Sequence, residues 1–268
     1  MLQSCQEARV AVEYARRGLV GTLTPQANTT VEPEFGILWP PGIAMVNARM
    51  VSAAPDMDAR LVEYFDRLDE WVAGFANAPI QALAVACTGA SYLAGVPRER
   101  RLADGLEARL GIPVVTAGTA VTDAFRALGA RRVALVSPYP AGLTAASVRN
   151  WTAQGFDVTE VVTVAPGGAG AFHPIYSMAA GDARRALDGL DGVAGLDAVA
   201  MLGTGMPTLG PILSKPRAGG APVLSCMLAT AWRTVLALDG AAPGRENLLA
   251  WIDDPEWQGR YRERTGEA

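Results

Sequence analysis

The stretch GIPVVTAGTAVTDAFRALG (111–129) resembles the stretch GAPVLSCMLATAWRTVLALDG (220–240). In both, a short apolar run leads into a helical pattern that ends at glycine, which predicts a buried strand followed by a helix. Two further pairs repeat in the same order: LTP (23–25) with VSP (136–138), and AVACTGASYL (84–93) with AVAMLGTGMPTL (198–209). The offsets are close, at 113 residues for Pro25 and Pro138, 116 for Cys87 and Gly203, and 109 for Pro113 and Pro222. The chain is therefore predicted to contain two homologous lobes related by pseudo-twofold symmetry.

Eight short apolar runs alternate with helical patterns along most of the chain. The runs are residues 18–23, 42–51, 82–87, 113–116, 132–137, 156–164, 198–202 and 222–225. Runs without polar alternation suit strands that are buried on both faces of a parallel sheet. Among the helical patterns, residues 61–75 present one apolar face, and residues 119–129 begin with a capping threonine and end at glycine.

These patterns predict an α/β fold with two pseudo-symmetric lobes, each a four-stranded parallel sheet flanked by helices. Lobe one comprises residues 1–116 plus 222–268, and lobe two comprises residues 117–221. Ligands bind at the carboxyl ends of parallel strands, so we expect the active site in the cleft between the lobes.

Composition excludes several classes of function. The chain has 268 residues, 50% of them hydrophobic and 19% charged, which is enough apolar material for a packed core. Its net charge of -4 argues against a nucleic-acid partner. One histidine, His173, and three separated cysteines, Cys5, Cys87 and Cys226, exclude a histidine-rich metal site, a zinc site and a disulfide framework. No nucleotide-binding glycine motif is present, so we expect neither a metal nor an organic cofactor.

The same sequence indicates where the protein works. No run reaches the ~18 apolar residues that span a bilayer, so no membrane partner is expected. The first 18 residues lack the apolar region of a signal peptide, which favours a cytoplasmic protein. Assembly into a homo-oligomer stays open.

Cys87 is the main candidate for chemistry. It ends a predicted strand and precedes a predicted helix, where free N–H groups and the helix dipole favour the thiolate and lower the thiol pKa. Such a cysteine can act as a nucleophile or as a proton donor, or it can be a buried structural residue. Cys226 also follows a strand, near the rim of the cleft, and is interpreted as a core cysteine. Tyr139 lies at a third strand end, where its phenol could donate to a carboxylate or simply pack.

Small and polar residues follow the other strand ends. Their hydroxyls and backbone N–H groups can form a nest for a carboxylate or phosphate, or can merely make tight turns: Thr88, Gly89, Thr204 and Gly205. Asn28 could hold a carboxylate or cap the next helix. His173 lies in a glycine-rich stretch that could form a lid, although a lone histidine before proline is often incidental.

These motifs resemble the aspartate/glutamate racemase superfamily, and more closely its branch of maleate cis–trans isomerases and arylmalonate decarboxylases. The resemblance rests on Pro25-Gln-Ala-Asn28-Thr29-Thr30-Val-Glu32, Ala86-Cys87-Thr88-Gly89, Pro138-Tyr139 and Gly203-Thr204-Gly205. It implies cofactor-free chemistry on a small carboxylic acid enclosed between the lobes. It also implies the following site, catalytic residues first: Cys87 and Tyr139; then, for substrate binding, Asn28, Pro25, Thr88, Gly89, Gly203, Thr204, Gly205 and His173.

One position departs from the family pattern. Many members carry a cysteine in each lobe, but here Gly203 stands where the lobe-two cysteine is expected, and Cys226 does not match that position. A two-thiol racemase is therefore disfavoured, and the sequence predicts an enzyme that works from one face with one thiol. The isomerase asparagine of the lobe-two loop has no clear match, since Phe172 or His173 falls near it.

Three functions remain. The first is isomerisation of a small unsaturated dicarboxylate with Cys87 as nucleophile, which the loop around Asn28 favours. The second is decarboxylation of an arylmalonate-type acid, with Cys87 as proton donor to an enediolate. The third is a non-catalytic protein that binds a small acid on an enzyme-like scaffold.

Overall fold

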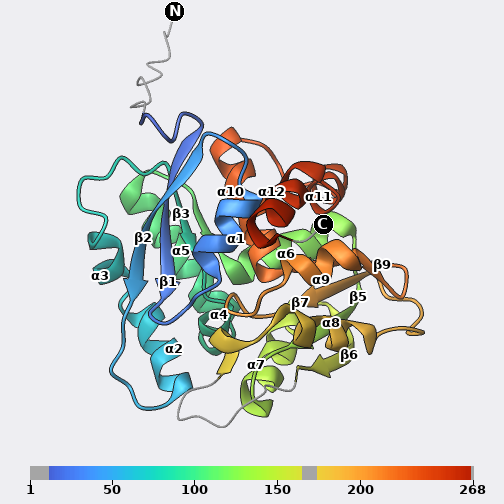
Figure 1. The fold of residues 1–268 in the computed structure, drawn as a ribbon. Coiled ribbons are helices and arrows are strands. Elements are labelled where there is room, and N and C mark those ends of the chain that lie inside the picture. The colour runs from blue at the N-terminus through green and yellow to red at the C-terminus, as the bar shows by residue number, and fades with distance from the viewer. Residues whose placement is uncertain (1–11, 165–173, 267–268) are drawn as a thin grey trace, which may run out of the picture.

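Two sheets form the two lobes, with sheet A on the left and sheet B at the lower right of Figure 1. The computed structural model describes residues 12–164 and 174–266. Sheet A has the order β2 (Ile43–Met50), β1 (Gly18–Pro25), β3 (Ala82–Val85), β4 (Val114–Thr116). Sheet B has the order β6 (Asp157–Thr163), β5 (Arg132–Ser137), β7 (Ala198–Met201), β9 (Ala221–Ser225), β8 (Arg217–Ala218). The matching strand orders bear out the two-lobe α/β fold.

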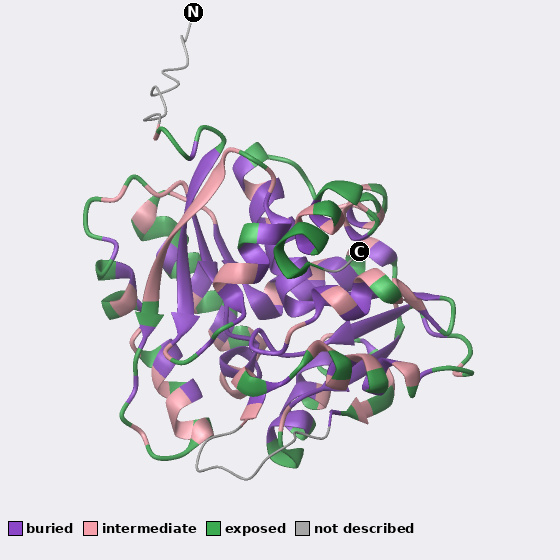
Figure 2. Ribbon diagram, in the orientation of Figure 1, coloured by how far each residue is buried: buried purple, intermediate pink, exposed green. Residues whose placement is uncertain are grey.

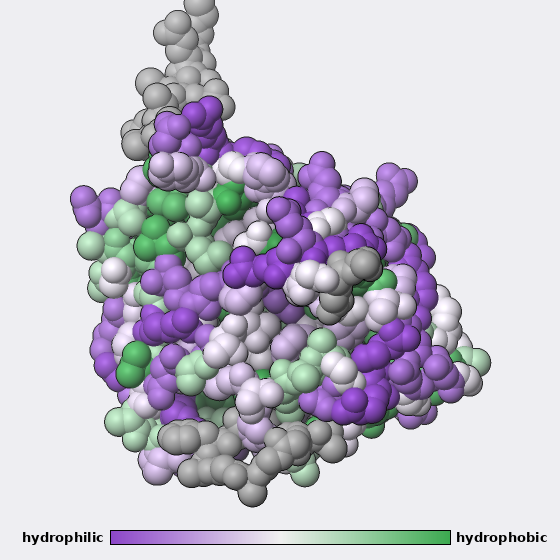
Figure 3. All heavy atoms as spheres, in the orientation of Figure 1, coloured by the Kyte–Doolittle hydropathy of each residue, from purple (hydrophilic) through white to green (hydrophobic). Residues whose placement is uncertain are grey.

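All eight predicted strands are present, and neighbouring strands pair in parallel except at one edge. There the two-residue strand β8, which the sequence did not predict, runs antiparallel to β9. Strands β1, β3, β7 and β9 are buried along their whole length, whereas the edge strands β2 and β6 are largely half-exposed (Figure 2). Burial on both faces explains why the inner strands read as unbroken apolar runs. Hydrophobic spheres gather at the upper left of Figure 3, over β2, where Ile43 and Met45 are half-buried.

Helices cover both sheets. They are α1 (Val31–Leu38), α2 (Met57–Asp66), α3 (Leu68–Ala73), α4 (Thr88–Ala94), α5 (Val96–Leu110), α6 (Ala117–Leu128), α7 (Ala141–Thr152), α8 (Ala180–Asp188), α9 (Leu209–Ser214), α10 (Cys226–Asp239), α11 (Arg245–Ile252) and α12 (Pro255–Thr265), with one 3-10 turn, η1 (Pro174–Ser177). The helix predicted over 61–75 is two helices, because the chain breaks at Arg67, whose guanidinium binds Glu63 and Glu70. None of the helices in these two described ranges is both long and apolar enough to cross a membrane.

Helices α6 and α10 pack against each other where the lobes meet. The Thr116 hydroxyl accepts the Thr119 N–H at 3.1 Å to begin α6, so the capping threonine is Thr116 and not Thr119. The Ser225 hydroxyl begins α10 in the same way by accepting the Leu228 N–H. Both helices end at a glycine in the left-handed region, with φ of 67° at Gly129 and 65° at Gly240.

The lobe boundary near residue 222 needs one correction. Strand β9 spans residues 221–225 and pairs with β7, so this strand belongs to sheet B rather than to lobe one. After it, α10 packs against β3, β4 and α1, so the chain returns to lobe one at Cys226. The boundary was misplaced because a short apolar strand can pair with either of two similar sheets.

Candidate active site

The carboxyl ends of strands from the two lobes face each other across hydrogen bonds. The Thr204 hydroxyl, after β7, donates to the carbonyl oxygen of Ala86, after β3, at 2.8 Å. The Thr30 hydroxyl in the loop after β1 donates to the carbonyl oxygen of Gly205 at 2.8 Å. The predicted strand ends of both lobes are therefore brought together in one place.

Asn28 is 2% exposed and mainly orders the loop after β1. Its Oδ1 accepts the backbone N–H groups of Thr30 at 2.8 Å and Val31 at 3.1 Å, at the start of α1. Its Nδ2 faces the Thr204 hydroxyl at 3.4 Å. The Asn28 amide oxygen thus performs the predicted role of helix capping. Only the amide nitrogen, which points toward lobe two, is left for the predicted role of holding a carboxylate.

Pro25 ends β1 and takes part through its backbone. Its carbonyl oxygen accepts from the Arg49 guanidinium at 3.2 Å, and the same Arg49 nitrogen donates to the carbonyl oxygen of Asn28 at 2.8 Å. Arg49 also pairs with Glu32. These contacts hold the loop from Pro25 to Asn28 in place against the cleft.

Cys87 lies between β3 and α4 and is 3% exposed. Burial raises the pKa of its thiol to about 12, although the N–H groups of Ala90 and Gly89 face the sulfur and lower the pKa in part. The predicted lowering of this pKa is therefore wrong, because the loss of hydration outweighs the field of a short helix. At neutral pH the site holds a neutral thiol.

Tyr139 and Thr88 lie beside this thiol. Burial raises the pKa of Tyr139, and charge on Cys226 or Cys87 raises it further, so both sulfurs lie within electrostatic reach of the phenol. The Thr88 hydroxyl is fully buried and forms no hydrogen bond of regular geometry within the described residues. Tyr139 and Tyr92 pack edge to face, with ring centroids 6.1 Å apart. A donor without a regular partner is thus available next to Cys87.

Gly203 has a backbone that disfavours any side chain. Its φ is +85°, and an added Cβ would lie 2.9 Å from Pro138 Cγ, 3.1 Å from Ile175 Cδ1 and 3.3 Å from the Tyr139 hydroxyl. Tyr139 therefore covers the position where the family pattern expects a second cysteine.

A pocket of about 190 Å³ opens next to these residues, between the loop after β1, helix α2 and η1. It is lined by Gln26, Ala27, Met57, Arg60, Leu61, Tyr64, Ile175 and Tyr176. Leu61 also lies against Gly89, and Tyr176 against Gly205, so the pocket adjoins the predicted carboxylate nest. Burial raises the pKa of Tyr64 to about 12 and also raises that of Tyr176, and charge on Cys87 adds to both shifts, so the thiol lies within electrostatic reach of the pocket.

The sequence did not reveal the residues that line the pocket, and the fully buried Cys226 agrees with its interpretation as a core cysteine. Tyr64 and Leu61 lie on a helix whose apolar face was interpreted as core, and Tyr176 lies in η1, which the Thr29 hydroxyl holds through the Tyr176 carbonyl oxygen at 3.0 Å. Only the position of Cys226 at a strand end signalled that it belongs near the cleft. The predicted binding residue His173 lies outside the described residues.

Comparison with known proteins gives consistent matches. The profile of the arylmalonate decarboxylase family matches residues 20–249, which span both lobes. A maleate isomerase of Nocardia farcinica is 28% identical over 246 residues, covering 86% of this chain and 94% of the relative. A maleate isomerase of Geobacillus stearothermophilus is 28% identical over 170 residues, and this match spans 56% of this chain and 64% of the relative.

One solved structure illustrates the chemistry of these relatives. A cysteine-to-serine variant of the Nocardia farcinica maleate cis-trans isomerase, solved with a covalently bound succinylcysteine intermediate, superposes with a TM-score of 0.71 at 23% identity. The superposition covers 83% of this chain and 93% of that chain. At this identity the likeness shows a shared fold.

Proposed function

Because the chain belongs to the arylmalonate decarboxylase family, we propose that it is a cofactor-independent isomerase of a small unsaturated dicarboxylate, with Cys87 as nucleophile. The family and the maleate isomerase relatives make it an enzyme of the isomerase or carboxy-lyase type that depends on cysteine. The observation that carries the proposal is the position of the Cys87 thiol, two residues before Gly89, which packs against Leu61 of the pocket. Next to it lies the Thr88 hydroxyl, which forms no regular hydrogen bond within the described residues.

Because the thiolate is the nucleophilic form, the neutral Cys87 thiol must lose its proton as its sulfur adds to the substrate. The sulfur of Cys87 forms a bond to one alkene carbon, the other alkene carbon gains a proton, and the former double bond becomes a single bond that can rotate. Elimination then breaks the C–S and C–H bonds, restores the thiol and releases the trans acid. Because the pKa of Cys87 is about 12, its thiolate is a poor leaving group. The sulfur must therefore receive a proton as the C–S bond breaks, which requires a proton-transferring group close by.

The binding residues divide between the lobes. Thr88 and Tyr139 would donate to the carboxylate on the reacting side, where negative charge develops as the sulfur adds. The Asn28 amide nitrogen would donate from the rim of the cleft, where it faces the Thr204 hydroxyl at 3.4 Å. Thr204 would position this amide, since its own hydroxyl proton goes to the Ala86 carbonyl oxygen. Gly89, Gly203 and Gly205 are retained as predicted members of the carboxylate nest, Pro25 supports the Asn28 loop, and His173 stays a predicted binding residue.

Proton NMR of the protein mixed with maleate tests this function directly. We expect a fumarate signal that grows with time in the native protein and is absent with Cys87→Ala. A Thr152→Val variant, altered at an exposed residue at the end of α7, controls for preparation. Native protein that leaves maleate unchanged would contradict the proposal, and a Cys87→Ala variant that still isomerises maleate would remove the role of the thiol.

The lining of the pocket favours a second candidate, decarboxylation of an arylmalonate-type acid. Met57, Leu61 and Ile175 give the pocket an apolar wall that a ring or alkyl group fits better than a second carboxylate does. In this reaction Cys87 need only donate its proton to the enediolate left by loss of carbon dioxide. Release of carbon dioxide from phenylmalonate, with no change in maleate, would favour it. A 2-substituted substrate should then give a product of the opposite hand to that of an enzyme whose cysteine lies in lobe two.

A further inference from the structure

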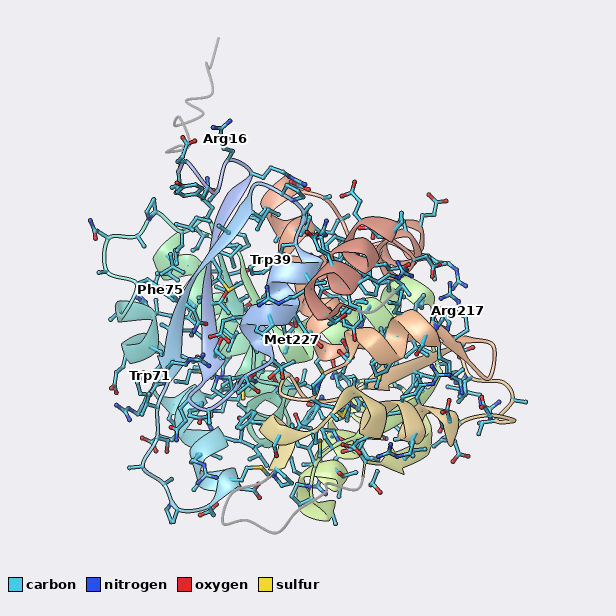
Figure 4. All side chains as sticks on the ribbon, in the orientation of Figure 1. Arg16, Trp39, Trp71, Phe75, Arg217 and Met227 are labelled. Carbon is cyan, nitrogen blue, oxygen red and sulfur yellow. The ribbon has the colours of Figure 1, made fainter. Side chains whose placement is uncertain are left out.

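Cys226 is a buried thiol for which the reaction above has no use. It is the first residue of α10 and directly follows β9. Because Ser225 of β9 is level with Met201 of β7, Cys226 reaches the same edge of sheet B as Gly203. It is fully buried, and Figure 4 labels its neighbour Met227 near the centre of the molecule.

The surroundings of the Cys226 sulfur are polar. The Gly203 N–H is directed at the sulfur, and the hydroxyls of Thr88 and Tyr92 lie beside it. Thr88 is the residue after Cys87, and Tyr139 lies close enough for charge on Cys226 to raise the pKa of its phenol. The Cys226 thiol, which follows β9, thus lies near Gly203, which follows β7 and has no side chain of its own.

Two buried hydroxyls beside this sulfur have no regular partner. Within residues 12–164 and 174–266, neither the Thr88 hydroxyl nor the Tyr92 hydroxyl forms a hydrogen bond of regular geometry, and these residues are 0% and 5% exposed. Buried hydroxyls almost always find an acceptor. A neutral thiol is a weak acceptor, but a thiolate is a strong one, so these donors become satisfied when Cys226 carries negative charge.

The same contacts favour negative charge on the Cys226 sulfur. Burial raises the pKa of Cys226, and the hydroxyl of Thr88 and the N–H of Gly203 oppose the rise. Charge on Cys226 contributes to the rise at Cys87, so the two sulfurs lie within electrostatic reach of each other. Gly203 itself cannot supply an acid, because its φ of +85° and its contacts with Pro138 and Tyr139 leave no room for one.

We propose that Cys226 is the second thiol of the active site and transfers the proton while Cys87 forms the bond to carbon. As the Cys87 sulfur bonds to one alkene carbon, the other carbon takes the proton of Cys226, and the proton of Cys87 passes to the Cys226 sulfur. One S–H bond and one C=C π bond are lost, and one S–C and one C–H bond form. Elimination reverses both transfers. The inference rests on the proposed isomerase function and replaces the one-thiol site that the sequence predicts.

The test compares Cys226→Ala and Cys226→Ser with the native protein, using maleate as the substrate. Removing a proton-transferring group typically lowers the rate by about 10²–10⁴-fold. We therefore expect kcat to fall at least about 100-fold in both variants, with KM within about threefold of native. Met227→Leu, a volume-conserving change at the next buried residue of α10, controls for local repacking and should keep native kcat.

Three readouts separate the outcomes. Urea unfolding midpoints of both Cys226 variants should lie close to that of Met227→Leu. A loss of activity in the Cys226 variants is then not caused by unfolding. If the native protein isomerises maleate and either Cys226 variant keeps the native kcat, the role of Cys226 is overturned and the proposed function stands. Failure of native protein and Met227→Leu alike to isomerise maleate would instead overturn the proposed function, and the inference with it.

Discussion

Replacing Glu34 with glutamine should make the stability of the protein less dependent on pH. Glu34 belongs to α1 in lobe one, and its Oε1 accepts the backbone N–H of Thr208 at 2.7 Å and that of Leu209 at 3.4 Å in lobe two. The Thr208 hydroxyl also bonds the Ser225 hydroxyl, at 2.9 Å. Burial raises the pKa of Glu34 from 4.5 to about 7, although the N–H groups of Thr208 and Leu209 oppose the rise. A titratable carboxyl therefore lies at the contact between the lobes.

The sign follows from the raised pKa of Glu34. The folded protein keeps a proton that the unfolded chain releases, so the contribution to stability is full below the unfolded pKa of 4.5 and is lost as the pH rises through about 7. With these two pKa values, the free energy of unfolding should fall by about 2.5 kcal/mol between about pH 5 and about pH 8. Glutamine has the same shape and does not ionise. The stability of Glu34→Gln relative to native should rise by this amount over the same interval.

The assay is urea unfolding followed by tryptophan fluorescence, at several pH values across this interval. The difference between native and Glu34→Gln is the measured quantity, because the contributions of all other titrating groups cancel in it. Glu246→Gln, at an exposed carboxyl in the first turn of α11, controls for the loss of one negative charge. A difference between native and Glu34→Gln that stays constant between about pH 5 and about pH 8 would refute the reasoning.

Three further predictions concern the site. The rate of Cys87 alkylation by iodoacetamide, followed by peptide mass spectrometry, should rise about tenfold per pH unit up to about pH 10, because a pKa of about 12 keeps the thiolate scarce. A rate that reaches a plateau near pH 9 would contradict the argument that burial raises this pKa. Gly203→Ala should lower the free energy of unfolding by about 1–3 kcal/mol, measured by urea unfolding, because its φ of +85° strains any side chain. Thr204→Val should lower it by about 1–2 kcal/mol through loss of the bond to Ala86, while the exposed Thr152→Val should change it little.

Local patterns predicted the fold well because its signals are local. The repeat of a strand, a turn and a helix is visible over about 20 residues, and the matching order of four strands in the two sheets follows from it. The break at Arg67 and the antiparallel strand β8 were missed because neither interrupts a hydrophobic pattern. The assignment of β9 to sheet B depends on pairing with β7, which no local pattern reveals.

The site was predicted only where it lies on strand ends. Cys87, Tyr139 and Gly203 follow strands, so the topology of parallel sheets brings them together and the prediction of their proximity needs no side-chain detail. Tyr64 reaches the pocket from α2, which packs on α4, and Tyr176 reaches it from η1, which the Thr29 hydroxyl of the other lobe contacts. The direction of the Cys87 pKa was predicted wrongly because the sequence shows a helix start but not the depth of burial.

The internal repeat gives a reason to regard the two buried thiols as a pair. It aligns Cys87 with Gly203, and at an offset of 109 residues it aligns Ala117 with Cys226. One thiol therefore follows a strand of sheet A, β3, and the other follows a strand of sheet B, β9, at the point where the chain returns to lobe one. If Cys226 only filled space, the alanine that serves at the equivalent buried position of lobe one would serve here as well. The buried hydroxyls of Thr88 and Tyr92 beside Cys226 instead match a sulfur that carries charge during the reaction, which is the role that the proposed proton transfer gives it.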